Sequence, residues 1–174
     1  MSLPALHQLN LSIRCLPMIS QLASRIAKTV AFFLLFIFAP NNFAASLALQ
    51  PHPSLTPQEV VEFQLTALQS AADGGIEATF RFASPANKRV TGPLTRFSRL
   101  FDSALYQPML DNKGTDIRLV RNDGFTAELM AGVVDDSGDI HWYRFRLSRQ
   151  TESPYLNCWM TDAVMAVDHP GRSA

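Results

Sequence analysis

The spacing of apolar residues changes near Gly114, and this change restricts the possible folds more than any other feature of the chain. Before Gly114, apolar residues recur every three or four positions, as on one face of an α-helix. After it, apolar and polar residues alternate, as on the two faces of a β-strand. Helices followed by strands predict an α+β domain, in which N-terminal helices pack on an antiparallel sheet of about four strands.

The first predicted helix has the clearest start. Thr56–Pro57–Gln58–Glu59 combines an N-cap threonine, a proline at the first helical position and a glutamate at N3, which is the capping-box arrangement. An apolar stripe follows, and Asp73–Gly74–Gly75 ends the helix. We expect a second, shorter helix that Ser84–Pro85 interrupts, because a residue before proline is displaced from the helical region. A loop over 86–92 then leads to a third helix, which Pro93 opens.

Two polar turns divide the second half of the chain into strands. Asn122–Asp123–Gly124 separates the first strand from the second, and residues 135–139 separate the second from the third. The third strand includes residues 141–147, and the fourth lies within residues 155–167.

The pairing of the last two strands decides which side chains share a face. If Phe145 pairs with Trp159, the aromatic side chains form one core face, and Arg144, Arg146 and Asp162 lie together on the other. A slip of one residue would regroup all of them.

The N-terminal segment has the pattern of an export signal. Basic residues in Arg25–Lys28 precede eleven uncharged residues, Thr29–Ala39, and Pro40 ends this apolar run. A helix of this length spans about 16 Å, against roughly 30 Å of membrane hydrocarbon. We therefore predict a signal peptide over 1–48, with Met18 as an alternative start. An uncleaved anchor or a buried core helix is the competing interpretation.

Cleavage before Leu49 would leave 126 of the 174 residues, enough for one domain. We expect a linker over 49–55, a single α+β domain over 56–168 and a short tail over 169–174. Since the leader holds three basic residues and no acid, the remainder has 12 basic and 15 acidic residues, a net charge of −3. This charge disfavours nucleic-acid binding. The leader predicts a periplasmic or secreted protein that meets the membrane only during export.

Cysteine and histidine usage predicts neither a disulfide nor a metal site in the exported domain. Cys158 would be its only cysteine, so no internal disulfide can form. We favour a buried, apolar thiol; a catalytic thiol would need His52, His141 or His169 nearby in a cleft. No Cys/His cluster has zinc spacing, and we expect no cofactor.

Asp162 is the weak catalytic candidate, because it is the one acid within a strand whose neighbours predict burial. It could equally be a hydrogen-bond partner for a buried backbone group or for Tyr143. Arg144 and Arg146 could hold an anion together with Asp162, although a solvated strand face with a surface ion pair is the favoured interpretation.

Three further residues are ligand-binding candidates. Lys88 lies in a polar loop that could rim a pocket or simply connect two helices. Tyr106 and Trp159 could line an apolar cavity, although large aromatic residues at such positions usually belong to the core.

Several segments of the chain resemble one family of bacterial and plant proteins, the domain of unknown function 4864. The segments that carry the resemblance are 56–61, Phe80–Asn87, Thr91–Pro93, Arg96–Phe97, Tyr143–Arg149 and Cys158–Asp162. The resemblance covers residues 56–167 and implies a fold similar to the nuclear-transport-factor-2-like cone, in which a curved sheet wraps around helices and leaves a pocket. Members often carry export signals. The resemblance implies no catalytic residue set, and the chain departs from the family pattern at Ala163, where glycine is common.

Three functions therefore compete. The favoured one is a non-catalytic, exported module that binds a small ligand in the pocket or a protein partner on the open sheet face. The second is a small pocket enzyme, an isomerase, dehydratase or hydrolase, with Asp162 as the base and Tyr106 or an arginine as its partner. The third is a structural homodimer that buries the outer face of the sheet.

Overall fold

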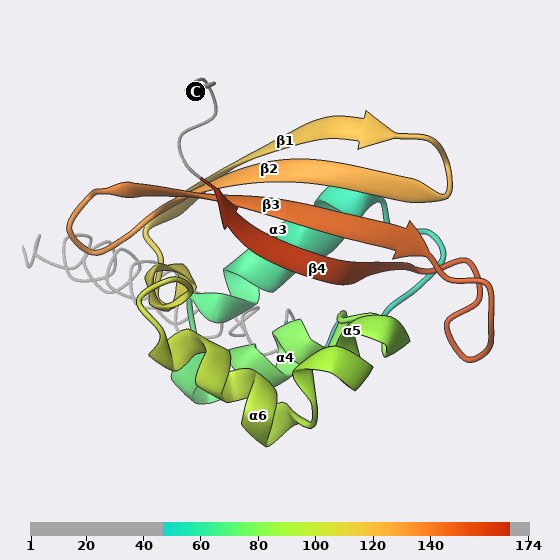
Figure 1. Cartoon of the computed structure of the whole chain (residues 1–174), viewed down its shortest axis with the longest axis horizontal. Helices are drawn as coiled ribbons and strands as arrows, with labels where there is room; N and C mark the ends of the chain where they lie inside the picture. The colour runs from blue at the N-terminus through green and yellow to red at the C-terminus, as the bar shows by residue number, and fades with distance from the viewer. Residues whose placement is uncertain (1–46, 168–174) are drawn as a thin grey trace, which may run out of the picture. The chain divides into compact units, whose positions relative to one another are not determined.

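A four-stranded antiparallel sheet with helices on one side makes up the part of the chain that the computed structural model describes, residues 47–167 (Figure 1). The α+β prediction is confirmed. The helical part contains α3 (Pro57–Leu68), η1 (Ala71–Asp73), α4 (Gly75–Arg81), α5 (Pro85–Thr91), α6 (Leu94–Ser98), η2 (Arg99–Asp102) and η3 (Gln107–Met109). The strands are β1 (Gly114–Asn122), β2 (Thr126–Val134), β3 (Ile140–Arg149) and β4 (Trp159–Val167).

Almost all of the predicted signal peptide, and all of the predicted tail, lie outside the described residues. Within residues 47–167, no helix is both long enough and apolar enough to cross a membrane.

Helix α3 begins as the sequence predicts. The Glu59 amide donates to the Thr56 hydroxyl at 3.2 Å, and the Thr56 amide donates to the Glu59 carboxylate at 2.7 Å. These two bonds satisfy donors that have no partner within the helix. The predicted stripe is buried as far as Leu68, and Figure 1 shows α3 lying against the sheet. The predicted end of this helix at Asp73–Gly75 is wrong, because α3 ends at Leu68 and Ala72, the last residue expected in the stripe, is exposed in η1. Val61, Leu65 and Leu68 thus join the core between helix and sheet.

The loop predicted over 86–92 is wrong, because Pro85–Thr91 form helix α5. Ser84 is extended, with a φ of −64° and a ψ of 160°, and its hydroxyl accepts from the Asn87 amide at 3.1 Å. An extended residue before proline is what an N-cap requires. Ser84–Pro85 therefore begins a helix, as Thr56–Pro57 does.

The four strands follow one another across the sheet in chain order, and every neighbouring pair is antiparallel. The expected alternation is confirmed in β2 and β3, where every second side chain faces the helices. These buried residues are Ala127, Leu129, Ala131, Val133, Tyr143, Phe145 and Leu147. The opposite face of β3 carries the exposed Arg144 and Arg146. The helices thus cover one face of the sheet.

The pairing of Phe145 with Trp159, on which the expected grouping of side chains depends, does not form. Phe145 lies opposite Val164, and Trp159 lies opposite Arg149. The register shifts between Arg146, which faces Ala163, and Leu147, which faces Thr161. Asp162 is therefore the extra residue of a β-bulge, which shifts the pairing beyond it. A hydrophobic pattern alone does not reveal such an insertion.

The predicted linker over 49–55, and Leu47 at the end of the predicted signal peptide, contact the domain. The Arg81 guanidinium donates to the carbonyls of Leu47 at 2.8 Å and Leu49 at 2.9 Å. Leu47 and Leu55 pack against the core. Ordered contacts therefore begin before Thr56, the expected first folded residue.

Candidate functional site

A cavity of about 470 Å³ lies between the helices and the β4 side of the sheet. Its lining comes from α3, α4, α5, α6, η2, η3, β3 and β4 and from the segments between them. Most of the lining is apolar, namely Leu65, Leu68, Ala83, Ala86, Val90, Phe97, Leu100, Phe101, Met109, Phe145, Ala163 and Val164. The polar lining residues are Gln64, Thr79, Asn87, Thr91, Tyr106, Thr161 and Asp162.

A buried hydrogen-bond network fixes part of the cavity wall. The Thr161 hydroxyl of β4 donates to the Gln64 side-chain oxygen of α3 at 2.6 Å. The Gln64 amide group donates to the Thr79 carbonyl of α4, and the Thr79 hydroxyl donates back to the Gln64 carbonyl, both at 3.1 Å. Gln64 is 3% exposed and Thr161 is 1% exposed. Because buried polar groups are costly when unpaired, this network holds two helices and a strand in one arrangement.

Two of the segments that carry the family resemblance meet at this wall. A parallel bridge joins Ala83 to Thr161, so Phe80–Asn87 lies beside Cys158–Asp162. The Ser84 amide donates to the Thr161 carbonyl at 2.9 Å, and the Asn87 side-chain amide donates to the same carbonyl at 3.1 Å. The free edge of β4 is thereby closed at this point by the start of α5.

Asn87 also carries an unsatisfied polar atom. Its side-chain oxygen is buried and has no hydrogen-bond partner within the described residues. An unpaired buried acceptor costs about 1–3 kcal/mol, so a native structure retains few of them.

Tyr106 lines the cavity, as one of the two sequence interpretations predicts. Its hydroxyl donates to the Val164 carbonyl of β4 at 3.0 Å, and its ring stacks on Tyr143 with a centroid separation of 6.3 Å. The hydroxyl is thus bonded to the backbone of β4 rather than to Asp162.

Asp162 lines the cavity as well, and no other lining residue in the described part of the chain has a charged side chain. It is half-buried, and its carboxylate makes no hydrogen bond or ion pair within residues 47–167. The other half-buried acids of that range have partners. Glu128 pairs with Arg144 at 3.0 Å, and Asp135 pairs with His141 at 2.7 Å.

The predicted grouping of Arg144, Arg146 and Asp162 on one face is wrong. Both arginines are exposed on β3, whereas Asp162 is half-buried and belongs to the cavity lining on β4. The favoured interpretation of the arginines, a solvated strand face with a surface ion pair, agrees with the Arg144–Glu128 contact.

Lys88 and Trp159 do not line the cavity. The Lys88 ammonium donates to the Arg81 carbonyl at 3.1 Å and lies 5.2 Å from the centre of the Phe80 ring. Burial, and then the nearby Arg81 charge, lower the pKa of Lys88. Trp159 is buried in the core, in agreement with the core interpretation.

The remaining candidates from the sequence are the Cys158 thiol and a metal site. Cys158 is buried, and burial raises the pKa of its thiol, which disfavours the nucleophilic thiolate. No group of three or more potential metal ligands lies close together in residues 47–167.

No family model, curated protein or solved structure matches the chain. Sequence reasoning identified two lining residues, Tyr106 and Asp162, as site candidates, and it missed the network of Gln64, Thr79 and Thr161. The available indications were an amide within the apolar stripe of α3 and a threonine within an apolar strand.

Proposed function

We propose that this domain is an exported, non-catalytic module that binds a small, mainly apolar molecule in the cavity between its helices and β4. The observation that carries the proposal is the cavity itself. Its volume of about 470 Å³ lies within the range of small-molecule sites, and apolar side chains with a few polar groups are the usual lining of such sites.

Buried and exposed residues of the lining have different roles in binding. Buried apolar side chains such as Phe97, Phe101 and Met109 offer contact to an apolar body. Each square ångström of apolar surface removed from water contributes about 25 cal/mol. Two lining residues, Val90 and Leu100, are 75% and 36% exposed, so the apolar wall continues to the protein surface. A ligand can therefore enter between α5 and η2.

We also propose that the chain belongs to the family named domain of unknown function 4864 and shares its cone-like fold. The support for this proposal is that two of the resembling segments, Phe80–Asn87 and Cys158–Asp162, both contribute to the cavity wall.

Filling the cavity tests the proposal. Ala86 lies near the start of α5, lines the cavity and is exposed, so a larger side chain there can enter the cavity without crowding the core. We expect octan-1-ol to bind the wild type and Ala86→Trp to reduce its affinity about tenfold or more, measured by calorimetry. Ala72→Trp is the control, since Ala72 is also exposed but lies outside the lining. Equal affinity of all three proteins, or no binding to the wild type, would contradict the proposal.

A small pocket enzyme is the second candidate, because Asp162 lines the cavity as that mechanism requires. The hydroxyl of its expected partner, Tyr106, donates to Val164 instead. The third candidate, a homodimer through the outer sheet face, stays a prediction that light scattering at tens of micromolar protein would test.

A further inference from the structure

The charge of the cavity lining restricts which apolar molecules the site can accept. Among the lining residues within 47–167, Asp162 is the only charged one, and none of them is a lysine, arginine or histidine. A ligand with a carboxylate or phosphate would meet no cation there and would lie near the Asp162 charge. Burying an unpaired charge is costly, so the lining disfavours anionic amphiphiles such as fatty acids.

The state of Asp162 adds a second observation. Of the half-buried acids in residues 47–167, Glu128 and Asp135 have a basic partner, and Asp162 has none. A carboxylate without a basic partner can form a charge-assisted hydrogen bond with a cation. Four aromatic side chains line the same cavity, and their ring faces also attract cations. The aromatic lining residues are Phe97, Phe101, Tyr106 and Phe145.

We infer that the cavity selects amphipathic amines: an apolar chain or ring occupies the apolar part of the cavity, and an ammonium group pairs with the Asp162 carboxylate. This inference rests on the proposed binding function and adds the chemical class of the ligand. Asp162 is the extra residue of the bulge in β4 and belongs to the cavity lining, whereas Arg144 and Arg146 of β3 lie outside that lining.

Three probes with the same eight-carbon chain separate the charge of the head group from the apolar contact. Octylamine carries an ammonium at pH 7, as a lysine side chain does, octan-1-ol is neutral, and octanoate is an anion. For the wild type, we expect calorimetry to give a dissociation constant about tenfold lower for octylamine than for octan-1-ol. Octanoate should bind more weakly than both.

Two variants assign the preference to one carboxylate. Asp162→Asn should bring octylamine to within about twofold of octan-1-ol, because it removes the charge and keeps the side-chain shape. Asp139→Asn is the matched control: it removes an exposed carboxylate outside the cavity and should leave the tenfold ratio unchanged. Asp162→Glu keeps the charge and should retain a preference for the amine, which covers the case in which the asparagine variant folds poorly.

The outcomes separate the two proposals. Binding of octan-1-ol with no preference for octylamine would overturn the amine inference and leave the binding function standing. A preference that survives Asp162→Asn in a folded protein would overturn the role of Asp162. Failure of all three probes to bind would overturn both proposals.

Discussion

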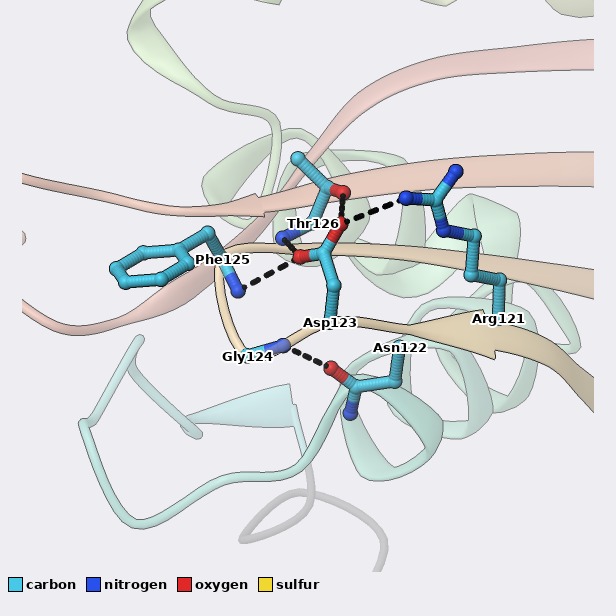
Figure 2. A network of polar contacts seen from close by, with 6 residues as sticks. All are labelled: Arg121, Asn122, Asp123, Gly124, Phe125 and Thr126. Carbon is cyan, nitrogen blue, oxygen red and sulfur yellow. Dashed lines mark hydrogen bonds and ion pairs between the residues drawn. The ribbon is translucent and has the colours of Figure 1, made fainter.

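Asp123, in the turn between β1 and β2, shows how strongly one exposed residue can organise a turn (Figure 2). Its carboxylate accepts from the Thr126 amide at 2.7 Å, from the Thr126 hydroxyl at 2.8 Å and from the Phe125 amide at 3.0 Å. Arg121 adds an ion pair at 3.2 Å. These interactions, the Thr126 amide bond first among them, lower the pKa of Asp123 to about 2. The sequence predicted this turn from Asn122–Asp123–Gly124, and the turn is confirmed.

The lowered pKa predicts a pH-dependent contribution to stability. In the unfolded chain an aspartate has a pKa of about 3.9. The contribution of Asp123 is therefore fully present above that pH and is lost as the pH falls towards 2. We expect the wild type to exceed Asp123→Asn in free energy of unfolding by a constant amount above about pH 5, and the difference to shrink between about pH 4 and pH 2.

Urea unfolding between pH 2 and pH 7 measures this difference. The control is Asp139→Asn, which changes an aspartate in the other hairpin turn, where residues 135–139 connect β2 to β3. A carboxyl titration of Asp123 near the ordinary aspartate pKa, followed by nuclear magnetic resonance, would contradict the prediction.

At the scale of elements, the crossing of α3 and α4 depends on a residue without a side chain. A Cβ added to Gly75 would lie 1.9 Å from the Ala67 carbonyl oxygen and 2.7 Å from that of Ser70. The preceding Gly74 is left-handed, with a φ of 93°. The sequence predicts that the first helix ends at Asp73–Gly74–Gly75, whereas α3 ends at Leu68 and Gly74 is the N-cap of α4. It did not predict that the second glycine allows α4 to approach α3.

Gly75→Ala is therefore expected to destabilise the domain by about 1–3 kcal/mol, because the added methyl group forces the two helices apart. The matched control is Gly114→Ala at the start of β1, where an added Cβ meets nothing within 4 Å. It should change the free energy of unfolding by less than about 0.5 kcal/mol. Denaturant unfolding compares the two variants; equal stabilities would refute the close crossing.

The sequence predicted the elements better than their pairing. The capping box at Thr56 and the alternation in β2 depend on residues close together in the chain, so a local pattern predicts them. Ser84–Pro85 predicts an interruption of a helix when only the residue before proline is considered, but the same pair has the chemistry of a helix start, and it begins α5. The bulge at Asp162 depends on how β4 meets β3, and no local pattern contains that information.

In the candidate site, too, the sequence predicted individual residues better than their contacts. Residue type predicts Tyr106 as a lining residue, and the apolar neighbours of Asp162 predict its burial; both line the cavity. The grouping of Asp162 with Arg144 and Arg146 depends on a register that the bulge changes. The Thr161–Gln64 hydrogen bond joins residues 97 positions apart, so no local sequence pattern predicts it.

At the scale of the whole molecule, two tyrosines join the helical layer to the sheet in opposite directions. The Tyr106 hydroxyl reaches from the segment before η3 to the Val164 carbonyl of β4 at 3.0 Å. The Tyr143 hydroxyl reaches from β3 to the Leu105 carbonyl at 3.0 Å. Their rings stack, and burial first, followed by the nearby Tyr106, raises the pKa of Tyr143 to about 12. The two bonds hold the same segment against the sheet beside the cavity.

Because both bonds fix one segment, their contributions to stability should be coupled. We expect Tyr106→Phe and Tyr143→Phe each to lower the free energy of unfolding by about 0.5–1.5 kcal/mol. The double variant should lose less than the sum of the two single losses, because a segment already released by the first change no longer benefits fully from the second bond. Tyr155→Phe is the control, because the Tyr155 hydroxyl makes no hydrogen bond within residues 47–167.

The pKa of Tyr143 adds an independent measure of this coupling. An unfolded tyrosine has a pKa of about 10, so the stability that Tyr143 contributes is present below pH 10 and is lost as the pH rises towards 12. Urea unfolding at pH 7 to 11 should show a shallower alkaline loss for Tyr143→Phe than for Tyr155→Phe. The prediction is contradicted if the losses in free energy of unfolding of the two single variants add up strictly at pH 7 and if Tyr143→Phe and Tyr155→Phe lose stability identically at alkaline pH. The two layers would then be held together without this pair of tyrosines. The cavity wall would then owe its position to the Thr161 network alone.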